Sequence, residues 1–132
     1  MDTIRIYKTA LLLFIIILII SGCAQKSAQS YQDISAKDLY SILQNEKDFV
    51  LIDVREPYEL IETGFIPGAV NIPMGQIKQK LSTLPQTGKL IIYCRTGRRS
   101  AKTAKFLAGK GYQNIYNLEG GIVDWPYEKI KS

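Results

Sequence analysis

One thiol stands at the end of an apolar run, in a segment rich in arginine. Residues 90–93 read LIIY, and Cys94 follows them at the head of the segment 94–100, CRTGRRS. The chain has two cysteines and no histidine. Nucleophilic cysteines are commonly activated by an adjacent base such as histidine. A reactive Cys94 must instead be stabilised as a thiolate by backbone N–H groups, a helix N-terminus and arginine charge.

The residues around Cys94 provide all three kinds of stabilisation. Gly97 allows an unusual backbone turn, and a helix predicted to start near Ser100 presents its positive end to the loop. Such loops gather several N–H groups toward one point and bind an anion there. Arginine side chains at the mouth attract anionic substrates; they are Arg95, Arg98 and Arg99. The alternative is that Cys94 is an inert, buried side chain and that the arginines are merely solvated.

The missing histidine excludes several other kinds of site. No Ser-His-Asp triad, Cys-His pair or histidine metal site can form within the chain. One remaining thiol is also too few for a thiolate zinc site or a C-x-x-C redox pair. We therefore expect no metal and no cofactor.

The N-terminus has the features of an export signal. Arg5 and Lys8 precede an apolar run over residues 10–20, which is shorter than the roughly 20 residues of a membrane-spanning helix and typical of a signal peptide. The following residues 20–23, ISGC, resemble the lipobox of bacterial lipoproteins. This resemblance implies that the chain is cut before Cys23 and that the thiol of Cys23 is acylated. An uncleaved anchor and ordinary signal cleavage are the alternatives.

These features divide the chain into three parts: a signal peptide at 1–22, a lipidated tether at 23–30 and a folded domain at 31–132. They predict a lipid-anchored protein on the extracytoplasmic side of a bacterial cell envelope. If Cys23 is acylated, Cys94 is the only free thiol, so no disulfide can form within the chain. A formal net charge of +5 suits an anionic lipid surface. The scattered lysines argue against nucleic-acid binding, and we expect a monomer.

Hydrophobic patterns in the folded part predict an α/β domain. Two short apolar runs, at residues 49–52 and 89–93, are typical of strands covered on both faces, as in a parallel sheet. Residues 114–117 are predicted to form a last strand. Helical patterns lie between and after these runs. The predicted helices are one opened by a capping box at Ser35, one at 56–61, one at 75–84, one over 101–108 and a C-terminal one carrying Trp125.

Four motifs in order resemble the single-domain rhodanese family of sulfurtransferases, over residues 31–129. They are DVREP at 53–57, GFIPGAVNIP at 64–73, YCRTGRRS at 93–100, and LEGGI at 118–122 with Trp125. The resemblance implies a rhodanese-like α/β fold with a central parallel five-stranded sheet flanked by helices. It also implies a reaction in which a cysteine takes a sulfane sulfur from a small anionic donor such as thiosulfate. The resulting persulfide passes its sulfur to cyanide or a thiol.

The resemblance also implies roles for individual residues. Cys94 is the nucleophile and persulfide carrier, and residues 95–99 form the cradle that binds the substrate. The cradle residues are Arg95, Thr96, Gly97, Arg98 and Arg99. Asp53 and Arg55 support the neighbouring segments. One residue departs from the family pattern, because Phe65 stands where the family usually has histidine.

Two other functions compete with sulfur transfer. Cell-cycle tyrosine phosphatases and related arsenate reductases share the fold and use a loop of the form C-x5-R. In this chain Ser100 occupies the position of that arginine, and Arg99 lies one residue earlier. The loop is therefore one residue shorter, which makes a cradle too small for a phosphoryl group. The other competing function is a non-catalytic binding or regulatory module, in which the cysteine is commonly replaced.

Overall fold

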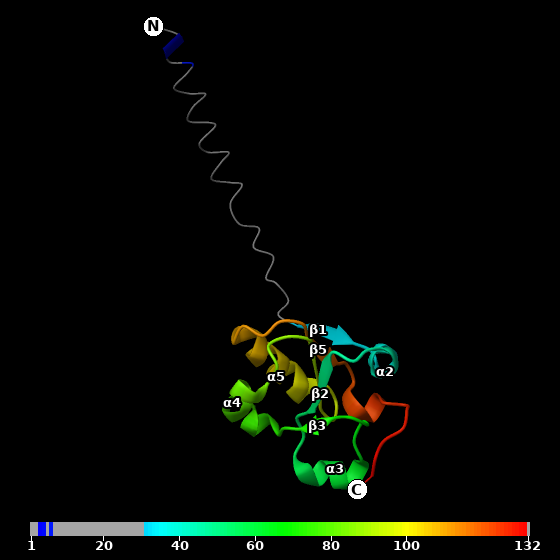
Figure 1. Ribbon diagram of the computed structural model, residues 1–132. Helices are drawn as coiled ribbons and strands as arrows, with labels where there is room; N and C mark the ends of the chain where they lie inside the picture. Colours follow the sequence, from blue (N-terminus) through cyan, green and yellow to red (C-terminus); the bar gives the residue numbers. More distant parts are fainter. Residues whose placement is uncertain (1–2, 5, 7–30, 132) are drawn as a thin grey trace.

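The computed structural model describes residues 3–4, 6 and 31–131. Cys23, the tether and most of the predicted signal peptide therefore lie outside the described residues. Within the described ranges, no helix is long and apolar enough to cross a membrane. Residues 31–131 fold around one sheet with helices on both faces (Figure 1).

The sheet has five strands, and every neighbouring pair is parallel. The order across the sheet is β1-β5-β4-β2-β3, so β4 lies at the centre. The strands are β1 (Gln32–Ile34), β2 (Phe49–Asp53), β3 (Val70–Asn71), β4 (Lys89–Tyr93) and β5 (Ile115–Leu118). This confirms the five-stranded parallel sheet that the family resemblance implies.

Alternate residues of the central strands enter two separate hydrophobic clusters. On one face, Leu90 and Ile92 of β4 pack with Ile52 of β2 beneath α4 (Ile77–Lys80) and α5 (Arg98–Gly109). On the other face, residues of the same strands pack against α2 (Ala36–Asn45) and the short helix η3 (Gly121–Asp124). Both faces of the sheet are therefore buried, which explains why the strands read as continuous apolar runs.

Two predicted helix starts are confirmed. The Ser35 hydroxyl accepts the N–H of Asp38 at 3.1 Å, and the Asp38 carboxylate accepts the N–H of Ser35 at 3.2 Å. This is the predicted capping box at the start of α2. Helix α3 (Pro57–Thr63) begins with proline in its first turn, where the missing N–H is not needed.

Three helix predictions need correction. The segment 75–84 forms three short turns, η1 (Met74–Gln76), α4 and η2 (Leu81–Thr83), and Leu84 is extended before a proline. No C-terminal helix carries Trp125: η3 ends at Asp124, and Trp125 is extended before Pro126. The helix after the cysteine loop begins at Arg98, two residues earlier than predicted, because Gly97 takes a left-handed conformation with φ 91°.

The topology places Cys94 where two chain connections part. Strand β2 continues through α3 to β3 at one edge, while the neighbouring strand β4 continues through α5 to β5 on its other side. In open α/β sheets, ligands bind at the carboxyl ends of strands where connections diverge in this way. Cys94 follows β4 at this point, beside the end of β2.

A buried ion pair fixes the end of β2. The Arg55 guanidinium donates to the Asp53 carboxylate at 2.7 and 3.0 Å, and both side chains are at most 1% exposed. The same guanidinium donates to the Thr63 hydroxyl and the Gly64 carbonyl, each at 2.8 Å. Burial lowers the pKa of Arg55, but the Asp53 carboxylate outweighs burial and raises it overall. The pair therefore attaches the C-terminal end of α3 to the sheet.

Replacing Arg55 should make the domain much less stable against unfolding. In Arg55→Met the Asp53 carboxylate remains buried without its partner, which lowers the free energy of unfolding by about 3–5 kcal/mol. Urea denaturation of the full chain measures the loss. The matched control is Lys89→Met, because Lys89 and Glu46 form an exposed pair at 2.7 Å, and its loss changes stability by at most about 1 kcal/mol. Equal losses in the two variants would contradict the structural role of Arg55.

Candidate active site

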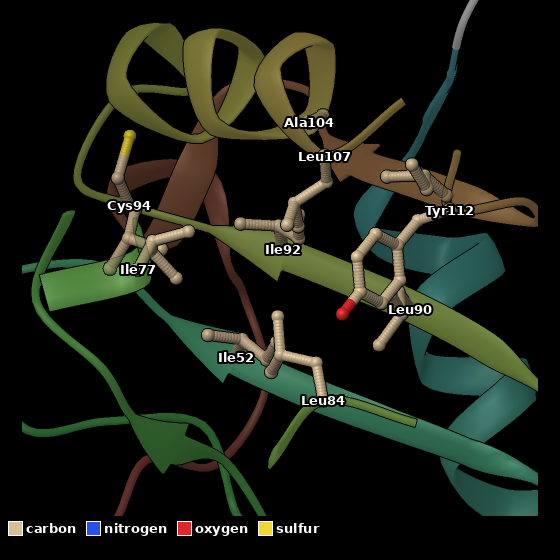
Figure 2. Close-up of a cluster of buried hydrophobic side chains, with 11 residues drawn as sticks. Ile52, Ile77, Leu84, Leu90, Ile92, Cys94, Ala104, Leu107 and Tyr112 are labelled. Carbon is tan, nitrogen blue, oxygen red and sulfur yellow. The ribbon is translucent and has the colours of Figure 1, made fainter. Parts of the chain in front are cut away.

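The Cys94 sulfur is buried and surrounded by hydrogen-bond donors. It accepts the N–H of Gly97 at 3.2 Å, the N–H of Ser100 at 3.5 Å and the Ser100 hydroxyl at 3.3 Å. Cys94 is 1% exposed and Ser100 is fully buried. Figure 2 shows the sulfur pointing from the end of β4 toward the first turn of α5, away from the apolar side chains beneath it. Such a ring of donors favours an anion at the sulfur position.

The Gly97 conformation makes this arrangement possible. Its left-handed backbone turns the chain directly from the loop into α5, so the first amides of the helix face the sulfur. A Cβ at Gly97 would lie 3.3 Å from the Gly120 nitrogen, so the position is also closely packed. Both the backbone angle and the packing favour glycine here.

The turn after β5 keeps the loop carbonyls away from the sulfur. The Cys94 carbonyl accepts the N–H of Ile122 at 2.9 Å, and the Arg95 carbonyl accepts the N–H of Val123 at 3.1 Å. A Cβ at Gly121 would collide with the backbone of both loop residues. Gly121 of the motif at 118–122 therefore lets this turn approach the Cys94 loop closely, and the turn amides bind the loop carbonyls on the side away from the sulfur.

The hydrogen bonds change the acidity of the thiol. Burial raises the pKa of Cys94, but donation from the Ser100 hydroxyl and from the amides of Ser100, Thr96 and Gly97 outweighs burial. The pKa of Cys94 is therefore below its ordinary value. The thiolate is the nucleophilic form of cysteine, so this environment favours reaction at the sulfur.

Arg99 connects the loop to α3. Its guanidinium donates two hydrogen bonds to the Glu59 carboxylate, at 2.7 and 2.8 Å. The bidentate pair lowers the pKa of Glu59 and raises that of Arg99, and the charge of the nearby Cys94 sulfur raises the pKa of Arg99 further. Arg99 thus stays beside the sulfur in a fixed orientation.

The structure gathers four of the five predicted cradle residues at one hollow. Arg95, Thr96, Arg98 and Arg99 line a cavity of about 270 Å³, together with Met74 and Lys102. The predicted supporting residues lie outside this hollow. Asp53 and Arg55 are buried under α3, which carries Glu59.

Two further predicted positions lie apart from this hollow. Phe65 pairs through its backbone with Ile130, with both N–H to carbonyl distances at 2.9 Å. Trp125 is buried on the other face of the sheet, where its indole N–H donates to the Glu128 carbonyl at 3.0 Å.

Sequence reasoning missed two residues of the site. The sequence predicts Ser100 as a helix start and as the position of an absent arginine, but not as a ligand of the sulfur, although a hydroxyl in the first turn of a helix after the loop is well placed to reach it. Glu59 gave a weaker signal, since the sequence shows only an acidic residue early in a helix. Its contact with Arg99 joins residues 40 positions apart, and only the fold brings them together.

Removing the Ser100 hydroxyl should make the thiol less acidic. Ser100→Ala deletes one donor to the sulfur, so the pKa of Cys94 rises and less thiolate is present at neutral pH. The test is the rate of alkylation by iodoacetamide, measured from about pH 5 to about pH 10, a range that includes ordinary thiol pKa values. In the variant the rate should rise at a higher pH than in the parent chain. At pH near 7 its rate should fall several-fold. Ser41→Ala, which changes an exposed serine in α2, is the control; identical pH profiles for Ser100→Ala and the parent chain would refute the role of the hydroxyl.

Comparison with known proteins shows to which family the chain is similar. The family model for the rhodanese-like domain matches residues 35–128. A sulfurtransferase of Allochromatium vinosum is 37% identical over 93 residues, which cover 70% of this chain and 86% of that protein. The putative sulfurtransferase YtwF of Bacillus subtilis is 38% identical over 97 residues, covering 74% of this chain and 92% of the relative.

A solved structure is also similar. The crystal structure of a rhodanese-related protein from Thermoplasma volcanium aligns with a TM-score of 0.69 and 36% identity, covering 77% of this chain and all of the other. The family model matches most of the chain, and its match includes the Cys94 loop, the Gly120–Gly121 turn and all the strands except β1. The chain therefore belongs to the rhodanese-like domain family.

Proposed function

We propose that this protein is a sulfurtransferase that carries sulfur as a persulfide on Cys94. The observation that carries the proposal is the buried Cys94 sulfur, which accepts three hydrogen bonds beside a cationic hollow. The names of the sulfurtransferase relatives support the same reaction class. The donor is a small anion such as thiosulfate, and the acceptor is cyanide or a thiol.

The first half-reaction loads the sulfur. The Cys94 thiolate attacks the outer sulfur of thiosulfate, and a new S–S bond forms as the bond to the sulfonate sulfur breaks. Sulfite leaves with the electron pair of that bond, and the outer sulfur of the persulfide carries the negative charge. The amides of Gly97 and Ser100 already point toward this region, so they can stabilise both the thiolate and the persulfide anion.

The second half-reaction unloads the sulfur. Cyanide or a thiolate attacks the outer sulfur of the persulfide, and the S–S bond breaks toward Cys94. Thiocyanate or a new persulfide leaves, and the Cys94 thiolate is restored with its hydrogen bonds. No proton transfer to or from the cysteine is required, which suits a site without histidine.

The arginines have different parts in this scheme. Arg95 and Arg98 are exposed at the hollow, so they attract the donor and bind its oxygen atoms. Arg99 is held by Glu59 and faces the sulfur, so its charge acts at a fixed position during both half-reactions.

The two competing functions have less support. A phosphatase loop needs a guanidinium at position 100, where this chain has a buried serine bonded to the sulfur. A binding module has no need for a buried thiol with a lowered pKa. The Ser100 contact with the sulfur and the lowered pKa of the Cys94 thiol both suit a reactive sulfur carrier.

Sulfur loading can be measured directly. The full chain, purified in detergent, should gain about 32 Da on Cys94 when it is incubated with thiosulfate, corresponding to one sulfur atom. Cyanide should remove this mass and release thiocyanate. Cys94→Ser should show neither effect, while Ser41→Ala in exposed α2 should behave as the parent chain. The absence of both mass gain and thiocyanate in the parent chain would rule out this function.

We further propose that the domain is anchored on the extracytoplasmic side of a membrane of the bacterial cell envelope by lipid on Cys23. The proposal rests on the charged and apolar N-terminal residues and on the segment ISGC at 20–23. Protein extracted from bacterial membranes should have a mature mass that begins at Cys23 with a diacylglyceryl group attached. Cys23→Ser should retain the uncleaved precursor mass. A mature chain that begins elsewhere, or that lacks lipid at Cys23, would contradict the proposal.

A further inference from the structure

The charges of the domain are segregated along the chain. Residues 63–118 include nine basic side chains and no acidic one. The rest of residues 31–131 contains five basic and eleven acidic side chains. Both α4 and α5 lie within the segment 63–118, so the segregation in sequence becomes a difference in charge between the two faces of the sheet.

The cationic side of the molecule lies over α4 and α5, which cover one face of the sheet (Figure 1). Five exposed basic residues of these helices form what we call the cationic face: Lys78, Lys80, Arg98, Lys102 and Lys105. The three from α5 are three or four residues apart and share one side of that helix, and Lys78 and Lys102 line the same hollow. None of the five forms an ion pair with another described residue. Their charges are therefore available to a partner.

The opposite face of the sheet has a different charge. It is covered by α2 and η3, and its exposed acidic residues include Asp38, Asp124 and Glu128. The basic residues in and just after α2 are Lys37 and Lys47. An anionic surface therefore attracts the cationic face more strongly than the opposite one, which gives the domain a preferred orientation on such a surface.

An apolar hollow opens within the cationic face. It has a volume of about 230 Å³, and its lining residues are Met74, Ile77, Lys78, Lys102, Thr103 and Phe106. Met74 is 37% exposed, so its thioether can be contacted from outside. Lysines around an apolar opening suit a lipid surface, because their ammonium groups can contact the headgroups while the apolar groups face the acyl boundary.

The tether enters the domain on the side of the cationic face. Residues 23–30 can span at most about 28 Å when fully extended, so Tyr31 stays within that distance of a lipid on Cys23. Tyr31 packs against the hydrophobic cluster beneath α4 and α5, and it lines a further hollow together with Arg98. A lipid on Cys23 therefore brings this side of the domain close to the bilayer.

We propose that the cationic face is a docking surface for a membrane with anionic lipid headgroups. This docking rests on the lipid anchor proposed above, which brings the face to the bilayer, and it is independent of the sulfur-transfer reaction. Each basic side chain near an anionic surface shifts the docking equilibrium about fivefold, so the five together fix the orientation. The hollow beside Cys94 shares Met74 and Lys102 with this face. Docking therefore places the opening of the candidate active site at the lipid surface.

The experiment measures which lysines a bilayer covers. The full chain is placed in nanodiscs of phosphatidylcholine alone or of phosphatidylcholine with phosphatidylglycerol, and a membrane-impermeant reagent acylates the accessible lysines. Peptide mass spectrometry gives the rate at each lysine. In the anionic discs Lys78, Lys102 and Lys105 should react several-fold more slowly than in phosphatidylcholine discs, whereas Lys37 and Lys47 should react at similar rates in both. High salt should remove the difference, because it screens the attraction.

Two matched triple variants test whether the cationic face causes this difference, with Lys102 as the reporter in both. The first variant removes three charges from the cationic face: Lys78→Gln, Lys80→Gln and Lys105→Gln. In it, Lys102 should react at similar rates in the two kinds of nanodisc. The second variant removes the same charge elsewhere: Lys37→Gln, Lys47→Gln and Lys129→Gln. There the slow reaction of Lys102 in anionic discs should persist. All six lysines are exposed, so both variants should fold.

The outcomes separate docking of this face from the lipid anchor. Slow acylation of Lys102 in anionic discs, lost in the first variant and kept in the second, supports the inference. A chain that attaches to the discs but reacts equally on both faces would refute the membrane as the partner of this face and leave the anchor standing. Slow acylation that is equally strong in phosphatidylcholine discs, or that persists in the first variant, would refute the role of charge. A chain that attaches to neither disc would refute the anchor and this inference together.

Discussion

The site depends on one constraint, which is that a buried sulfur must hold negative charge in a chain without histidine. Burial alone opposes the thiolate, so several donors have to converge on the sulfur. Backbone amides can do this only if the chain turns sharply after Cys94 and if the loop carbonyls point elsewhere. Gly97 meets the first condition, and the Ile122 and Val123 amides meet the second. The cradle is therefore built jointly by the loop and by a turn 26 residues later, as measured from Arg95 to Gly121.

A second set of contacts links the sheet to the rim of the site through a series of ion pairs and hydrogen bonds. Asp53 forms an ion pair with Arg55, and Arg55 donates a hydrogen bond to the Gly64 carbonyl at the end of α3. Glu59 of the same helix forms an ion pair with Arg99. The first pair is fully buried and the last is partly exposed. A charge near the sulfur is thus fixed by a chain of side chains that begins in the core. Such indirect support explains why two buried residues of the DVREP motif bear on the site without lining it.

The sequence predicted the parts of this fold that depend on local patterns. The buried strands β2 and β4, the Ser35 capping box and the position of Cys94 after the central strand follow from apolar runs and spacing. Strands β1 and β3 have three and two residues, which is too short for any periodicity, so only the family resemblance implied them. The prolines at 85 and 126 limited helices that apolar spacing alone extended too far. The contact of Glu59 with Arg99 joins residues 40 positions apart and depends on tertiary packing, so no pattern along the chain encodes it.

Activation and substrate choice rest on different kinds of group in this site. Two of the three hydrogen bonds to the Cys94 sulfur come from backbone amides, which side-chain substitutions leave in place, whereas the rim of the hollow is made of side chains. Phe65 illustrates the separation, because it replaces the usual family histidine and yet no hydrogen bond to the Cys94 sulfur involves that position. Ser100 is the exception, since its hydroxyl contacts the sulfur directly. A site built in this way can change its rim while it keeps its nucleophile.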